Sequence, residues 1–135
     1  AAAAGFKDRI STHSGNVLDS STVLPDSPDA VWMSQFLDCF SLEEIQNILK
    51  KIKRCVPSDC NIFVLEPLWD MQRFEAASYS IQATSIYFAA MANGNSKMYS
   101  YSDLVGAIEA VGCTLVRAHH NLGINSYSLL QFHVS

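Results

Sequence analysis

The sequence lacks closely spaced cysteine pairs. Its four cysteines are Cys39, Cys55, Cys60 and Cys113, and no two of them form a Cys-x-x-Cys segment. All except Cys55 lie in apolar or strand-like sequence, where a free thiol behaves as a small hydrophobic side chain. We therefore expect reduced cysteines and a cytoplasmic protein.

Positive charge and long apolar runs are also scarce. The formal net charge is −4, so the chain lacks the basic surface that nucleic-acid binding requires. The only basic run, 50–54, ends an expected helix, where the dipole favours cations, so a solvated helix face explains it better than a binding patch. The longest apolar region, 81–92, is broken by polar residues and too short to cross a bilayer. No signal peptide is recognisable, so we expect a soluble protein with neither nucleic acid nor membrane as partner.

The sequence does contain enough apolar material for one folded domain. Of its 135 residues, 49% are hydrophobic and 16% are charged, proportions typical of a globular chain with a core. We predict a single domain over residues 1–135. The opening Ala1–Gly5 has the pattern of a last helical turn, from which we expect the chain to be a fragment of a longer protein.

Strand and helix patterns alternate along the chain. The segment 10–18 is a weak candidate for a first strand, and 30–36 predicts a strand buried on both faces, as in a parallel sheet. Ser41 and Glu44 form a capping box, which predicts the start of a helix there. The segment 61–67 predicts the next strand, so strand, helix and strand make a βαβ crossover.

The second half predicts two more helices and a hairpin. Residues 71–91 have helical length, and their apolar side chains cover so much of the circumference that the helix needs partners on more than one side. A shorter helix is expected over 100–111, followed by strands at 113–120 and 127–134. The predicted fold class is α/β, ending in an antiparallel β-hairpin.

Two carboxylates stand at the ends of neighbouring predicted strands. Asp38 follows the strand at 30–36, and Glu66 ends the strand at 61–67. Ligands of open α/β sheets collect at the carboxyl ends of strands, where burial and mutual repulsion raise a carboxyl pKa toward the range of a general base. Each residue is therefore a candidate catalytic group. The alternative is that each only caps or solvates a helix end.

Aromatic and histidine residues give weaker signals. Trp32, Trp69 and Tyr79 either line a pocket or belong to the core, which is the more common place for aromatic side chains. His119 and His120 are adjacent on a strand and project to opposite faces, so they cannot share a metal ion. We expect no metal site.

The order of these parts resembles the C-terminal half of the catalytic domain of S-adenosylmethionine-dependent O-methyltransferases, in particular the small-molecule enzymes of plants and bacteria. The likeness is carried by DAVWMSQFLDCFSLEEIQNILKKI at 29–52, NIFVLEPLWD at 61–70 and YSYSDLVGAIEAVGCTLVRAH at 99–119. It implies an incomplete Rossmann-like methyltransferase sheet, with S-adenosylmethionine as the cofactor of the intact protein. It also implies methyl transfer to an oxygen, or else a nitrogen, of a small aromatic or polyketide-like acceptor.

The resemblance also implies roles for single residues. Asp38 matches the family histidine that removes the proton from the acceptor, and Glu66 matches the glutamate that orients that histidine. The expected cofactor-binding residues, at the ends of the first two predicted strands, are Gly15, Asn16, Val17, Ser34 and Gln35. The residues expected in the acceptor pocket or at a subunit interface are Trp69, Tyr87, Phe88 and Met91.

Several family features are missing. No residue matches the second family glutamate, expected near 94–99, and the Gly-x-Gly-x-Gly loop and the ribose-binding acidic residue have no counterpart. A non-catalytic binding or assembly module with the same fold is therefore the rival function. A different α/β nucleotide-binding protein is disfavoured, since no phosphate-binding loop occurs. Because the first strand would lack its neighbours, we expect either a homodimer that covers the free sheet edges or a displaced N-terminal segment up to about Pro28.

Overall fold

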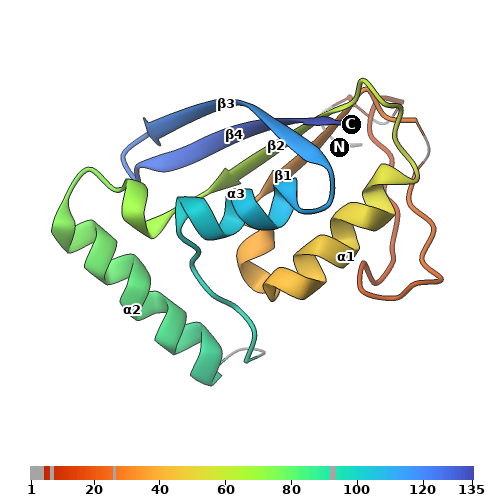
Figure 1. The fold of residues 1–135 in the computed structure, drawn as a ribbon. Helices are drawn as coiled ribbons and strands as arrows, with labels where there is room; N and C mark the ends of the chain where they lie inside the picture. The colour runs from red at the N-terminus through yellow and green to blue at the C-terminus, as the bar shows by residue number, and fades with distance from the viewer. Residues whose placement is uncertain (1–4, 7, 26, 92–93) are drawn as a thin grey trace.

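One mixed sheet organises the chain. The computed structural model describes residues 5–6, 8–25, 27–91 and 94–135, and its sheet has four strands in the order β1-β2-β4-β3 (Figure 1). The strands are β1 (Ala30–Ser34), β2 (Asn61–Glu66), β3 (Cys113–Leu122) and β4 (Tyr127–Val134). β1 and β2 are parallel, whereas β4 is antiparallel to both of its neighbours. The predicted α/β class with a closing antiparallel hairpin is confirmed.

Helix α1 (Leu42–Lys53) forms the crossover between β1 and β2. The predicted capping box is present: the Glu44 N–H donates to the Ser41 hydroxyl at 3.3 Å, and the Ser41 N–H donates to the Glu44 carboxylate at 2.8 Å. The apolar stripe of the helix is buried and consists of Ile45, Ile48, Leu49 and Ile52. Local sequence therefore determines both where this helix begins and which face it packs on the sheet.

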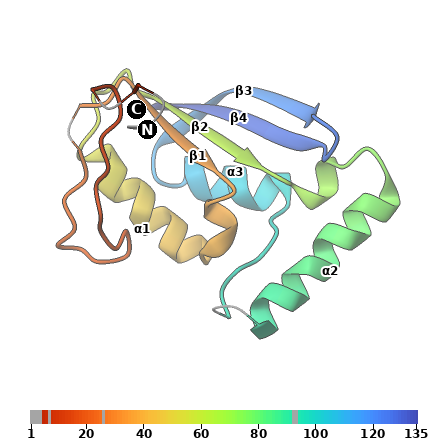
Figure 2. The ribbon, with the colours of Figure 1, turned by 180° about the vertical axis from the view of Figure 1, so that it is seen from behind.

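Helices α1 and α3 (Tyr101–Glu109) pack on the same face of the sheet (Figures 1 and 2). The strand residues that point toward them are fully buried and include Ile62, Val64, Leu130 and Phe132. The prediction that β1 is buried on both faces is wrong. Met33 is buried, but Trp32 is 59% exposed beside Phe63, because the two packed helices cover only the opposite face.

Helix α2 (Glu75–Met91) projects away from the sheet (Figures 1 and 2). It begins later than residue 71, where the sequence predicts it, because a 3-10 turn, η3 (Trp69–Met71), comes first. None of its residues is buried, although a helix that is apolar on several sides normally is. α2 therefore offers a surface for further contacts. No helix in the described ranges combines the length and apolarity needed to cross a bilayer.

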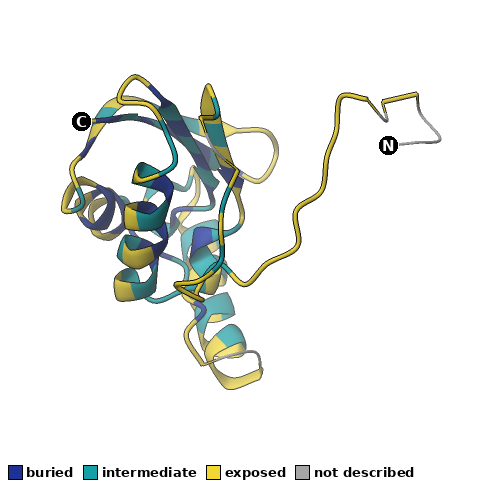
Figure 3. Cartoon of the chain, turned by 90° about the vertical axis from the view of Figure 1, so that its right-hand side faces the viewer, coloured by how far each residue is buried: buried dark blue, intermediate teal, exposed yellow. Residues whose placement is uncertain are grey.

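No strand forms in the described residues before Ala30, so the predicted strand at 10–18 is wrong. That segment has no neighbouring strand to pair with, and its backbone meets α1 instead. The Lys51 ammonium donates to the carbonyl oxygens of Val17, at 2.8 Å, and Asp19. Most of the segment is exposed (Figure 3). A displaced N-terminal segment, one of the two expected outcomes, is what the structure has, and the helical turn expected at 1–5 lies outside the described residues except for Gly5.

Lys53, in the basic run at the end of α1, binds main-chain oxygens. Its ammonium donates to the oxygens of Val111 at 2.9 Å, Gly112 at 2.8 Å and Ser135 at 3.0 Å. The lysine thereby joins the end of α1 to the turn after α3 and to the residue after β4. This placement agrees with the interpretation of the run as helix-end cations rather than a binding patch.

Replacing Lys53 with Met is expected to lower the free energy of unfolding by about 1–2 kcal/mol. Hydrogen bonds from a charged donor are stronger than neutral ones, but two of the three here are exposed to water. Urea denaturation followed by circular dichroism measures the change. Lys50→Met is the matched control, because Lys50 is exposed on the same helix. Equal midpoints for wild type and Lys53→Met would contradict this role.

Candidate active site

The parallel pair β1 and β2 brings two strand ends together. Ser34, the last residue of β1, is paired with Leu65, next to the end of β2 at Glu66. The chain leaves β1 through Gln35, whose φ of 47° lies in the left-handed region, and enters the 3-10 turn η2 (Leu37–Cys39). Asp38 is the central residue of that turn. The sharp reversal therefore places Asp38 beside the end of β2, as the sequence predicts for two neighbouring strand ends.

Glu66 is buried, with 3% of its surface exposed. Its Oε1 accepts hydrogen bonds from the main-chain N–H groups of Phe36 and Leu37, both at 2.9 Å. Its Oε2 has no hydrogen-bond partner among the described residues. Glu66 thus holds the backbone of the turn that carries Asp38, a contact that the sequence does not predict.

Burial raises the pKa of both carboxyl groups. It raises the pKa of Glu66 from its ordinary 4.5 to about 7, and the negative charge of Asp38 adds to the effect. Burial also raises the pKa of Asp38, against the hydrogen bonds from Cys39 and the turn. A carboxylate with a raised pKa is a stronger base than an exposed one, which is the requirement for general-base chemistry near neutral pH.

A third segment, 94–100, closes the site from the side of α3. The Lys97 N–H donates to the Asp38 carbonyl at 2.9 Å, and the Tyr99 hydroxyl donates to the Phe40 carbonyl at 2.6 Å. The small cavity between the three segments is lined by Asp38, Glu66, Pro67, Leu68, Met98, Tyr99 and Leu104. It has no room for a water molecule. Asp38 itself is half-buried, so it is accessible from its exposed side but not through this cavity.

Sequence reasoning missed Tyr99 and Met98. Residues 94–99 contain no acidic residue that could be the second family glutamate. Tyr99 belongs to no recognisable motif, so nothing in the sequence marks it as part of a site. The signal that was available is the apolar character of Met98 and Tyr99 within a polar stretch. This character predicts that the two side chains are buried, but it does not identify the residues that they contact.

This arrangement of strand ends and carboxyl groups agrees with a comparison of the sequence with known families. The family model of the O-methyltransferase domain matches residues 1–108. The chain belongs to the O-methyltransferase family.

Solved structures share the fold of this O-methyltransferase chain. The crystal structure of LaPhzM matches with a TM-score of 0.80, 16% identity and 99% coverage of this chain. The mitomycin 7-O-methyltransferase MmcR matches with a TM-score of 0.80 and 18% identity, also over 99%. PigF, solved with SAH, matches with a TM-score of 0.74 and 19% identity over 98%. In each case the chain spans 37% of the matched chain's length. No curated protein matches the sequence.

The cofactor candidates of this O-methyltransferase chain lie in two separate places. Ser34 and Gln35 are exposed at the carboxyl end of β1. The segment 15–17 lies beside α1, where Val17 contacts Lys51 (Figures 1 and 2). A cavity of about 330 Å³ is lined by Val17 and by Met33 and Phe36, which flank Ser34 and Gln35 in the sequence, but Gly15, Asn16, Ser34 and Gln35 do not line it. The roles of both groups stay predictions.

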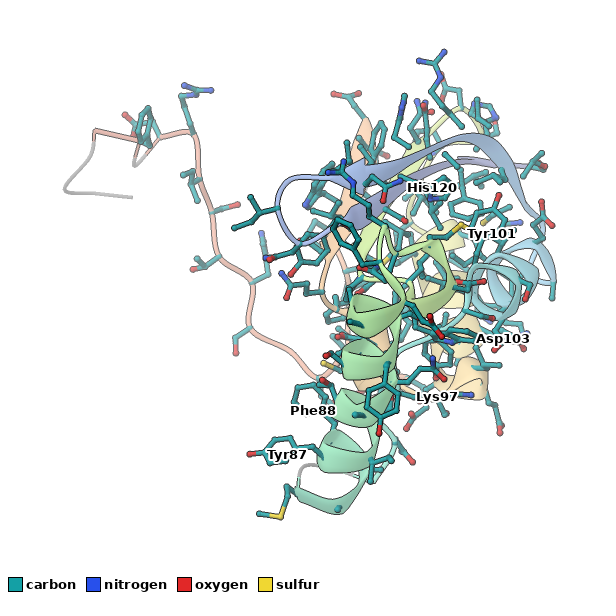
Figure 4. The ribbon with its side chains drawn as sticks, turned by 90° about the vertical axis from the view of Figure 1, so that its left-hand side faces the viewer. Tyr87, Phe88, Lys97, Tyr101, Asp103 and His120 are labelled. Atoms are coloured by element: carbon teal, nitrogen blue, oxygen red, sulfur yellow. The ribbon has the colours of Figure 1, made fainter. Side chains whose placement is uncertain are left out.

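The acceptor-pocket candidates lie on η3 and α2. Trp69 is half-buried in η3, and its main-chain N–H donates to the Tyr99 carbonyl at 3.3 Å. Tyr87 and Phe88 contact each other edge to face with ring centres 5.8 Å apart, and Tyr87 projects outward from α2 (Figure 4). Met91 is 70% exposed at the helix end. None of the three α2 residues is buried in the chain's own core, so their predicted contact with an acceptor or a second subunit stays a prediction.

The two adjacent histidines do not meet. His119 is exposed, whereas His120 Nδ1 lies 2.8 Å from the Ser128 hydroxyl oxygen and its ring stands edge-on to Tyr101 (Figure 4). In the part of the chain that the structure describes, no three His, Cys, Asp or Glu side chains are close enough to hold a metal ion.

Proposed function

We propose that this chain is the acceptor side of the catalytic domain of an S-adenosylmethionine-dependent O-methyltransferase acting on a small aromatic or polyketide-like hydroxyl compound. The observation that carries the proposal is the pair of carboxyl groups at the adjacent ends of β1 and β2, half-buried Asp38 and buried Glu66. Family membership supplies the class of reaction. The acceptor class and the cofactor go beyond that membership and form part of the proposal.

Asp38 is the general base in this proposal. Its carboxylate accepts the proton of the acceptor hydroxyl, so that the oxygen attacks as an oxyanion. Glu66 keeps the turn 36–38 in place through the two N–H groups that it accepts, and this fixes the base relative to the acceptor. The cofactor, when bound, supplies the methyl group on a sulfonium centre.

Three further features of the intact protein belong to the proposal. S-adenosylmethionine as cofactor is supported by the fold shared with PigF, which was solved with SAH. A homodimer is supported by α2, an apolar helix none of whose residues is buried, and by β1, which is at the edge of the sheet that the described residues form. The four cysteines, which form no disulfide in the structure, support a cytoplasmic location.

A non-catalytic binding or assembly module is the second candidate. The observation that favours it is the cavity beside Asp38 and Glu66, which has no room for a water molecule in this chain. A module that had lost its chemistry would have no need of an open site.

Cofactor binding and methyl transfer separate the two candidates. The full-length protein that contains this chain is expected to bind S-adenosylmethionine with micromolar affinity in calorimetric titration. With a panel of phenols and hydroxyquinones it should give products about 14 Da heavier. The 135-residue chain alone should show no binding, because it has no counterpart of the family's Gly-x-Gly-x-Gly loop or of the acidic residue that binds the ribose. Micromolar binding by the isolated chain would contradict this assignment, and absence of binding and transfer in the full-length protein would favour the module.

A further inference from the structure

The turn that carries Asp38 is held at four main-chain groups by two distant parts of the chain. Glu66 accepts from the N–H groups of Phe36 and Leu37 at its beginning. The segment 97–99 holds the other half: Lys97 donates its N–H to the carbonyl of Asp38, and the Tyr99 hydroxyl donates to the carbonyl of Phe40. The turn is therefore fixed from both sides. One of the four bonds comes from the side chain of Tyr99, which has no role in the proposed function.

Tyr99 is well placed to act as a rigid donor. It is 4% exposed, and its hydroxyl oxygen lies 2.6 Å from the Phe40 oxygen. The Lys97 ammonium stands 5.5 Å from the centre of its ring. Burial, together with the carboxylates of Glu44, Asp103 and Asp38, raises the pKa of Tyr99 to about 12. The hydroxyl therefore stays protonated and donates across the range of pH in which an enzyme works.

The bond from Tyr99 acts on the end of the turn. Phe40 is the C-terminal cap of η2, and its N–H already donates to the Leu37 carbonyl at 3.1 Å. With the bond from Tyr99, both the N–H and the carbonyl of Phe40 are hydrogen-bonded. Asp38 lies between this end of the turn and the Glu66 contacts, and it is half-buried.

We propose that Tyr99 is a positioning residue that acts through the main chain of 38–40 to keep the Asp38 carboxylate in its half-buried place. This rests on the proposed function, in which Asp38 is the base. The competing explanation is that the hydroxyl bond only satisfies a buried polar group and stabilises the fold. The two differ in one respect: a purely structural bond has no effect on the titration of Asp38.

The test compares Tyr99→Phe with Tyr101→Phe. Both substitutions remove one hydroxyl, and the Tyr101 hydroxyl makes no hydrogen bond within the described ranges. Carboxyl ¹³C NMR of the chain then follows the titration of Asp38, whose carboxyl group is faced by Glu66 from β2, by Tyr99 from the closing segment and by its neighbour Cys39. The Lys97 ammonium lies over the Tyr99 ring. In Tyr99→Phe the pKa of Asp38 is expected to fall toward that of an exposed aspartate, since the loosened turn lets water reach it. In Tyr101→Phe it should not change.

Kinetics of the full-length protein give the second readout. Tyr99→Phe should lower kcat roughly 10-fold, with KM for S-adenosylmethionine unchanged, because a displaced base slows proton removal without touching the cofactor. An unchanged Asp38 titration in a folded Tyr99→Phe chain would overturn the proposal, as would a variant that does not fold, since the hydroxyl would then serve the whole fold. If Tyr99→Phe shifts the titration but Asp38→Asn leaves turnover intact, the positioning stands and the proposed base is wrong.

Discussion

Replacing Asp38 with Asn in the full-length protein is expected to lower kcat by about 10²–10⁴-fold, with little change in affinity for S-adenosylmethionine. Asparagine has nearly the same shape as aspartate but cannot accept a proton, so only the base function is lost. The substitution leaves the Lys97 bond to the main-chain carbonyl of residue 38 intact. Single-turnover kinetics with a phenolic acceptor and calorimetry with the cofactor measure the two quantities.

Asp59→Asn is the control for this experiment, because Asp59 is exposed in the turn before β2. It removes the same charge from the chain without touching the strand ends. Wild-type turnover in Asp38→Asn would return Asp38 to the alternative of a carboxylate that only solvates the start of a helix. A loss of activity accompanied by a loss of thermal stability would instead indicate that the turn had changed its shape.

Replacing Glu66 with Gln is expected to make stability less dependent on pH. The folded state raises the pKa of Glu66 from 4.5 to about 7, so folding favours the protonated form. The free energy of unfolding therefore falls as pH rises from about 4.5 to about 7, by on the order of 3 kcal/mol for this group. Glutamine keeps the acceptor oxygen for Phe36 and Leu37 and carries no charge, so it resembles the protonated glutamate at every pH.

The measurement is urea denaturation of both chains at pH 4.5, 6 and 8. Similar stability at the lowest pH and a more stable Glu66→Gln chain at pH 8 is the expected result. Glu43→Gln is the control, because Glu43 is exposed in the first turn of α1. If the free energy of unfolding depends on pH in the same way for wild type and Glu66→Gln, ionisation of the buried carboxyl group does not destabilise the folded state. The raised pKa would then be wrong.

The sequence alone predicted most of the elements, because the signals for them are local. The capping box of Ser41 and Glu44 lies within four consecutive residues and begins α1 as expected. The hairpin of β3 and β4 likewise follows from two apolar runs separated by a short polar loop. The sequence also predicted that Asp38 and Glu66 lie close together, since residues at the ends of adjacent parallel strands meet at one edge of the sheet.

The segment 10–18 shows where local patterns fail. Its sequence has weak strand character, but a strand exists only where a neighbour accepts its hydrogen bonds, and none of the described residues provides one. Trp32 shows the same limit for burial. The apolar run around it is compatible with two covered faces, and only the placement of α1 and α3 on a single side decides that the tryptophan is exposed.

What the sequence by itself determined is the order of strands and helices, the family resemblance and the pair of carboxyl groups at one edge of the sheet. Only the tertiary structure decided how that pair is held. Glu66 contacts Phe36 across 30 positions of the sequence, and Tyr99 contacts Phe40 across 59. Such bonds join a side chain to main-chain groups that every residue possesses, so no residue pattern marks the partner. They form because the folded backbone leaves buried N–H and C=O groups that must be satisfied, a requirement that arises only once the chain is packed.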